Sequence, residues 1–205
     1  MHKIDSVRRN DDSNEAVVIC DGEYFRITVH DLEIMEIEDG DLIDDEVFEH
    51  LGEASERLSC IKKAFDFLSY GDLSEKQLRD KLMRKFDKDL ACDVAALFVE
   101  RGYIDDLKLA ERYAETFYEF KNMGLSRIRS ELYRRGISRE NIEIALEKYE
   151  NEDQSERIEE FVRKKYDTSR LSDANYRRKV YSGAIRAGFA SSDISDFLRN
   201  FESEY

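Results

Sequence analysis

A pattern of apolar residues that recurs about every 50 residues is the feature that most constrains the fold of this chain. Three pairs with helical spacing carry it: Leu78 and Leu82, Ile128 and Leu132, and Val180 and Ala184. An amphipathic segment precedes each pair and another follows it. The repeating unit is therefore three helices of about 50 residues, present three times, and the third copy matches by spacing rather than identity.

The passage 97–106 marks the seam between the first two units. A helix-period stretch ends near Phe98, and Gly102 is placed to turn the chain. Asp105 or Asp106 is then the N-cap candidate for a helix that carries an apolar stripe from Ala110 to Phe120. The acidic pair is better explained by capping than by metal binding.

The sequence predicts a mainly α protein made of tandem three-helix repeats, three units forming an elongated array, with a small N-terminal antiparallel β segment. Four segments are expected: a small acidic β region at 1–52 and three-helix repeats at 53–105, 106–152 and 153–205.

The β segment is predicted from alternation and one turn signal. A strand-like run at 16–20 is followed by Asp21-Gly22 and by a second alternating run at 24–29. A short helix is expected at 30–37 and another at 44–50. A sheet this small is marginal alone, so it should pack on another element or move relative to the array.

Charge is unevenly distributed. The net charge is -14, and residues 1–52 carry 4 basic and 16 acidic residues, which leaves 29 basic and 31 acidic residues for 53–205. The helical array is thus nearly neutral, with basic clusters on its helices. The acidic front either serves solubility and packing or mimics nucleic acid against a basic surface.

The sequence contains no pattern typical of an enzyme. It has no nucleophile motif, glycine-rich phosphate loop or metal-ligand spacing, so no catalytic, cofactor or metal residues are predicted. Cys20, Cys60 and Cys92 are interpreted as free, mostly buried thiols in a reducing compartment. With no membrane-length apolar run and no signal-peptide pattern, a soluble cytoplasmic protein without membrane contact is expected.

With these repeats in place, the chain resembles the RecX family, the regulatory proteins of the bacterial RecA recombinase. The matching motifs are Leu68-Ser69-Tyr70, the run from Ser74 to Leu82, Gly102-Tyr103-Ile104-Asp105-Asp106, Ala110, Ile128, Glu131-Leu132 and Gly136-Ile137. The strand pair around Asp21 also resembles the N-terminal extension of members from Gram-positive lineages. Two departures are the missing glycine at Lys85-Phe86 and the degenerate third repeat.

The resemblance implies a non-enzymatic protein that binds the RecA filament on single-stranded DNA, along its helical groove. It would modulate, and is expected to inhibit, the ATPase, strand exchange and filament extension. A monomeric cytoplasmic protein acting in recombination, DNA repair and the SOS response is implied, without any cofactor.

Periodic basic residues are the candidates for partner binding. The set is Arg79, Arg84, Lys85, Arg127, Arg129, Arg134, Arg135, Arg177, Arg178 and Arg186. One position recurs with the repeat, as Arg84, Arg134 and Arg186. They would contact acidic recombinase surface or phosphates, because arginine makes forked contacts to both. The alternative is that they form solvated faces balanced by neighbouring Glu and Asp.

A DNA-binding protein is the alternative function. Three-helix units can present a recognition helix to the major groove, and the basic middle helices would be that element, giving weak direct DNA binding. The acidic front weighs against this function, because it repels a phosphate backbone. Tyr118 and Tyr133 could stack on bases, although packing between repeats is the favoured use.

Overall fold

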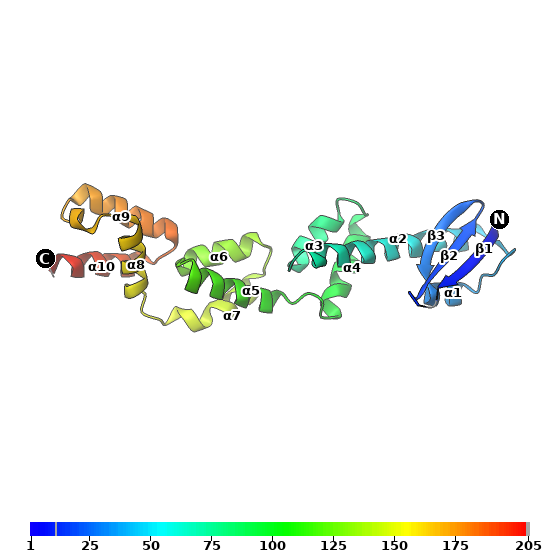
Figure 1. The fold of residues 1–205 in the computed structure, drawn as a ribbon, viewed down its shortest axis with the longest axis horizontal. Helices are drawn as coiled ribbons and strands as arrows, with labels where there is room; N and C mark the ends of the chain where they lie inside the picture. The colour runs from blue at the N-terminus through cyan, green and yellow to red at the C-terminus, as the bar shows by residue number, and fades with distance from the viewer. Residues whose placement is uncertain (11, 204–205) are drawn as a thin grey trace. The chain divides into compact units, whose positions relative to one another are not determined.

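A computed structural model describes residues 1–10 and 12–203 of the chain, which divide into two compact units. Unit 1 contains residues 1–72 and 78–101, and unit 2 contains residues 73–77 and 102–205. The fold is mainly helical with a small N-terminal sheet (Figure 1), as the sequence predicts.

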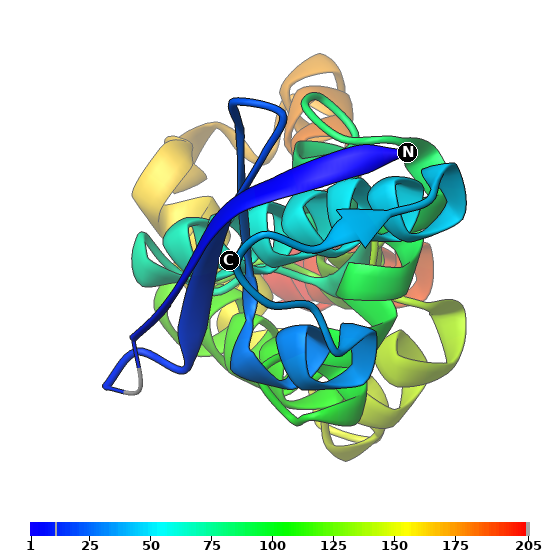
Figure 2. The ribbon, with the colours of Figure 1, turned by 90° about the vertical axis from the view of Figure 1, so that its right-hand side faces the viewer.

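Unit 1 begins with a four-stranded antiparallel sheet in the order β3-β2-β1-β4. Its strands are β1 (His2–Asn10), β2 (Glu15–Cys20), β3 (Glu23–Thr28) and β4 (Leu42–Ile43). The three long strands lie side by side in Figure 2, joined between β2 and β3 by the predicted Asp21-Gly22 turn, where both residues have positive φ. β4 is an additional strand that the sequence did not indicate.

Two helices cover this sheet. Thr28 and Asp31 form a capping box that starts α1 (Val29–Met35), and Asp44 caps α2 (Asp45–Ser69). α2 packs on β3, and a core from Ile4 to Leu51 lies between sheet and helices. The 25-residue α2 runs through position 52, so the predicted division between 52 and 53 falls inside one helix.

The first three-helix repeat consists of α2, α3 (Glu75–Leu82) and α4 (Lys88–Glu100). Leu58, Ala64 and Val94 are buried, and the Phe65 and Phe98 rings lie 4.7 Å apart. These are the apolar stripes that the sequence predicts. Cys60 is fully buried, and burial raises the pKa of its thiol to about 11.

The second repeat, in unit 2, has its own core. Its elements are α5 (Asp106–Glu115), the π-helical turn η1 (Thr116–Phe120), α6 (Leu125–Arg134) and α7 (Arg139–Glu150). Ile128 and Leu132 are fully buried against α5 and α7. Tyr118 is buried and stacks on Tyr149 at 4.0 Å, which places it in packing rather than on the surface.

The third repeat also has its own core. It comprises α8 (Ser155–Lys165), a 3-10 turn η2 (Thr168–Arg170), α9 (Ala174–Ala187) and α10 (Ser191–Ser203). Val180, Ala184 and Phe189 are buried in it, at positions equivalent to Ile128, Leu132 and Ile137. The weak third copy therefore folds like the others.

Within unit 2, the second and third repeats meet where the start of α6 contacts the end of α9. Gly124 donates its backbone N–H to the Ala187 carbonyl at 2.9 Å, and Ser126 donates to Gly188 at 3.2 Å. These bonds satisfy N–H groups at one helix start and carbonyls at the other helix end. A Cβ on Gly124 would lie 2.1 Å from the Gly188 carbonyl carbon, so only glycine fits.

Arg157 of α8 reinforces this joint. Its guanidinium lies 3.4 Å above the Tyr118 ring and donates to the carbonyls of Tyr118 and Met123, each at 2.9 Å. The same guanidinium lies 5.8 Å from the Phe189 ring centre. An arginine from the third repeat therefore completes the polar contacts of the second.

A related joint involves the start of α3, whose residues 73–77 belong to unit 2. The Ser74 hydroxyl donates to the Arg135 carbonyl at the end of α6, at 2.6 Å, and Glu75 donates its N–H to Asp106 at 3.0 Å. Asp105 caps its own helix through Lys108. Both predicted capping residues therefore cap a helix, Asp105 at the start of α5 and Asp106 at the start of α3. Burial raises the pKa of the Asp106 carboxyl.

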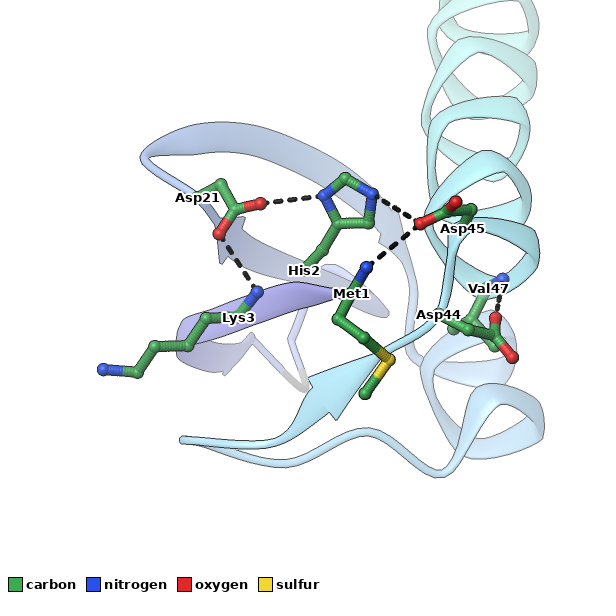
Figure 3. A network of polar contacts seen from close by, with 7 residues as sticks. All are labelled: Met1, His2, Lys3, Asp21, Asp44, Asp45 and Val47. Carbon is green, nitrogen blue, oxygen red and sulfur yellow. Dashed lines mark hydrogen bonds and ion pairs between the residues drawn. The ribbon is translucent and has the colours of Figure 1, made fainter.

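A polar network ties the start of β1 to α2 (Figure 3). The His2 ring stacks on Phe48 at 3.9 Å and lies between two carboxylates, 2.8 Å from Asp21 and 3.3 Å from Asp45. The Met1 amino group contacts Asp45 at 3.1 Å and lowers the pKa of that carboxyl. The pKa of Asp21 is lowered most by the hydrogen bond that its carboxylate accepts from the Lys3 backbone N–H, and next by its hydrogen bond with His2.

Replacing Gly124 with alanine tests the joint. Because the added Cβ overlaps backbone atoms, we expect Gly124→Ala to lower the free energy of unfolding by about 1–3 kcal/mol, measured by urea denaturation. Gly52→Ala in α2 is the control, because its Cβ would meet nothing closer than a Phe25 ring atom at 4.0 Å. That variant should be neutral or stabilising, since alanine favours helix. Equal effects would contradict the steric account.

The His2 network predicts a stability loss in acid. Asp21 and Asp45 have folded-state pKa values below their unfolded values, so their contribution is present at neutral pH and disappears below about pH 4. The double variant Asp21→Asn/Asp45→Asn should melt below the parent at pH 6 and approach it at pH 3, measured by calorimetry. A constant difference across this range would contradict the assignment.

Candidate partner-binding surface

The structure separates the ten predicted basic residues by unit and by what each side chain contacts. Three of them, Arg79, Arg84 and Lys85, belong to unit 1, and the other seven belong to unit 2. Arg84 and Lys85 are exposed but lie in the turn after α3, because that helix ends at Leu82. Phe86 closes the turn on the Leu82 carbonyl at 3.1 Å, without the glycine that the second and third repeats use.

Several cations of the second repeat are held by their own repeat. Arg129 joins α6 to α7 through Glu143, at 3.0 Å, and Glu150. Arg135 is three-quarters buried and lies 4.8 Å above the Tyr113 ring and 5.4 Å from the Phe117 ring. Arg129 and Arg135 therefore stabilise the repeat, whereas the pair Arg134–Glu131 lies at the surface, where ion pairs contribute little.

Other predicted cations have no carboxylate partner within the described residues. On unit 2 these are Arg127, Arg178 and Arg186, all exposed. Arg178 lines an open groove of about 760 Å³ between α9 and α10, together with Arg177, Tyr181 and Arg199. Arg127, Arg178 and Arg186 are therefore the members of the predicted set on unit 2 whose charge is available to a partner.

A cleft of about 230 Å³ beside the joint contains basic residues that sequence reasoning missed. It is lined by Phe120, Lys121, Asn122, Met123, Arg127, Phe161, Lys164, Lys165 and Ala187. Arg127 belongs to the predicted set, while Lys121, Lys164 and Lys165 do not. Lys121 directly follows η1 and the other two belong to α8, so all three lie outside the middle helices where the periodic signal lies. The Arg163-Lys164-Lys165 run was a visible signal for Lys164 and Lys165, and Lys121 had none.

Electrostatics of this cleft favour an anionic ligand. Lys164 pairs with Glu160 at 2.6 Å, but Lys121, Arg127 and Lys165 have no carboxylate partner among residues 1–10 and 12–200. The Lys121 and Lys165 ammonium groups each lie 4.8 Å from an aromatic ring centre, of Phe117 and Phe161. Phe120 at the rim is 82% exposed. The cleft thus combines unpaired cations with apolar surface.

Metal binding and membrane spanning are also predicted to be absent from this chain. No group of three or more His, Cys, Asp or Glu side chains that could hold a metal ion occurs among the residues described. Within the same residues, no helix is both long and apolar enough to cross a membrane.

Comparison with known proteins shows to which family this chain belongs. The family model "RecX, second three-helix domain" matches residues 105–146, and "RecX, third three-helix domain" matches 152–198. A regulatory protein RecX from Caldanaerobacter subterraneus is 33% identical over 173 residues, covering 82% of this chain and 86% of the relative. This chain belongs to the RecX family. It is a member of a family of regulatory proteins.

Two further RecX comparisons agree with this assignment. A regulatory protein RecX from Clostridioides difficile is 26% identical over 189 residues, covering 87% of this chain and 82% of the relative. A crystal structure of a regulatory protein RecX covers 98% of this chain and 100% of its own, with a TM-score of 0.80 and 21% identity. The solved structure supports the fold, and the matched repeats coincide with the second and third repeats described above.

Two arginine variants distinguish structural from available cations. Arg135→Gln removes the stacking on Tyr113 and Phe117, so we expect it to lower the free energy of unfolding by about 1 kcal/mol. Arg127→Gln should change it by less than about 0.5 kcal/mol, because the side chain is exposed. Urea denaturation of both variants measures this, and the reverse order would contradict the assignment.

Proposed function

We propose that this RecX-family chain binds the RecA recombinase filament on single-stranded DNA and inhibits its ATPase, strand exchange and extension. Family membership supports the partner, and the available cations of unit 2 support the surface. The observation that carries the proposal is that Arg127, Arg178 and Arg186 keep exposed, uncompensated charge in a chain whose net charge is -14.

The joint between the second and third repeats supports this use. Gly124, Gly188 and Arg157 fix one repeat on the other, so cations from both are presented with a set spacing. A preorganised surface loses little conformational entropy on binding. A filament offers many identical sites, so contacts from two repeats to neighbouring protomers would add by avidity. Bridging protomers in this way would restrain the filament and slow its ATP hydrolysis.

Direct recognition of duplex DNA by the middle helices fits the structure less well. A recognition helix contacts base edges with residues near its N-terminus. The first turn of α6 is bonded to the end of α9, and that of α3 is bonded to Asp106 and Arg135. The starts of these two middle helices are therefore occupied by protein, whereas the start of the third, α9, is capped by its own Asp173.

The test is the single-stranded-DNA-dependent ATPase of the cognate RecA, titrated with this protein at fixed salt. We expect the rate to fall at substoichiometric ratios, because one bound molecule affects several protomers. Arg127→Glu/Arg178→Glu/Arg186→Glu should need at least about tenfold more protein, since each charge-assisted contact contributes on the order of 1.5 kcal/mol.

The matched control is Arg8→Glu/Arg9→Glu/Arg139→Glu, which makes the same change in net charge at exposed positions elsewhere. It should inhibit like the parent. A flat ATPase rate with the parent protein would contradict the proposal. If the protein alone also shifts DNA with a steep salt dependence, DNA binding would replace it.

A further inference from the structure

We infer that the cleft beside the joint, lined by Phe120, Lys121, Arg127, Phe161 and Lys165, binds an acidic peptide segment that carries one apolar side chain between its carboxylates. The inference rests on the proposed function in taking the partner to be a protein, and it adds the chemistry of the segment that is recognised. Hereafter this site is called the basic cleft.

The size and lining of the basic cleft set the kind of group that enters it. Its volume of about 230 Å³ is below the range of drug-sized pockets and suits a single side chain. Met123, Phe161 and Ala187 provide apolar wall, and Phe161 and Ala187 are more than nine-tenths buried. An apolar side chain inserted there would lose water contact against side chains that are already ordered.

The charges at the basic cleft indicate which groups of the peptide flank the inserted side chain. Lys121, Arg127 and Lys165 are unpaired in the described part of the chain, whereas Lys164 is neutralised by Glu160. Three cations around one apolar wall are complementary in charge to a peptide that has carboxylates on both sides of an apolar residue. Stacking of Lys121 on Phe117 and Lys165 on Phe161 restricts both ammonium groups, which favours a defined register.

Phe120 is the second apolar element of the site. It ends the π-helical turn η1 and is 82% exposed, so the core of the second repeat does not use it. Exposed aromatic residues beside uncompensated cations are typical of binding hot spots. On a bound peptide, the Phe120 ring would cover the inserted side chain.

A peptide fits these observations better than a nucleic acid does. A phosphate backbone places a charge on every nucleotide and has no apolar side chain to insert between those charges. A short acidic segment supplies anionic groups as well, and its apolar residue also uses the buried wall that a phosphate would leave unused.

The experiment measures binding of a fluorescein-labelled pentapeptide, Glu-Asp-Phe-Glu-Asp, to the full chain by fluorescence anisotropy, without recombinase. Saturable binding should weaken at least about tenfold in Arg127→Glu/Lys165→Glu. It should weaken about fivefold in Phe120→Ala, which removes an exposed side chain and should fold normally. The double variant Arg139→Glu/Lys179→Glu, outside the lining, makes the same charge change and should bind like the parent.

Three results would overturn the inference: no saturable binding by the parent, equal loss in the cleft and control variants, or tighter binding of a labelled dT5 oligonucleotide with the same residue dependence. The two proposals fail separately. Absent peptide binding with intact ATPase inhibition rejects the peptide site alone. Peptide binding with a flat ATPase rate rejects the recombinase function alone.

Discussion

The close contact of Gly124 with Gly188 is the constraint on which the organisation of unit 2 depends. Two backbones approach until a single Cβ would overlap, and the N–H groups that start α6 bond to the carbonyls that end α9. The positive end of one helix dipole thereby meets the negative end of another. The core clusters of the second and third repeats share no member, and backbone bonds together with Arg157 connect the two repeats.

Much of the fold could be predicted because helix periodicity survives in each repeat. The pairs headed by Leu78, Ile128 and Val180 are all fully buried, and the Asp21-Gly22 turn joins two strands as expected. The predicted division at 52/53 falls inside a helix, because the sequence pattern does not show that the helix expected at 44–50 continues past Gly52 into the first repeat. In the structure α2 continues through it, since the helix is held by the sheet on one side and by the first-repeat core farther along.

Less of the candidate site could be predicted, because spacing locates a charge but not its partner. Arg127 and Arg129 stand two positions apart in the same predicted basic cluster, yet Arg129 binds Glu143 while Arg127 lies at the basic cleft. Lys121 and Lys165 are 44 positions apart, and only the joint brings η1 and the end of α8 to one cleft. A site created by a contact between repeats has no local signature within either repeat.

The same joint explains why one terminus of α3 and one terminus of α9 differ from the corresponding terminus of α6. α9 starts at Ala174 under its own Asp173 cap, so its first turn is satisfied without another repeat, whereas α6 has no side-chain cap. The end of α3 differs in another way. The turn that follows it has no positive-φ glycine, whereas α6 and α9 are followed by Gly136 and Gly188, which lie in close contact with a neighbouring segment. The missing glycine at Lys85-Phe86 and the Asp173 cap of α9 therefore belong to the two termini of α3 and α9 that take no part in the backbone joints at Gly136 and Gly188.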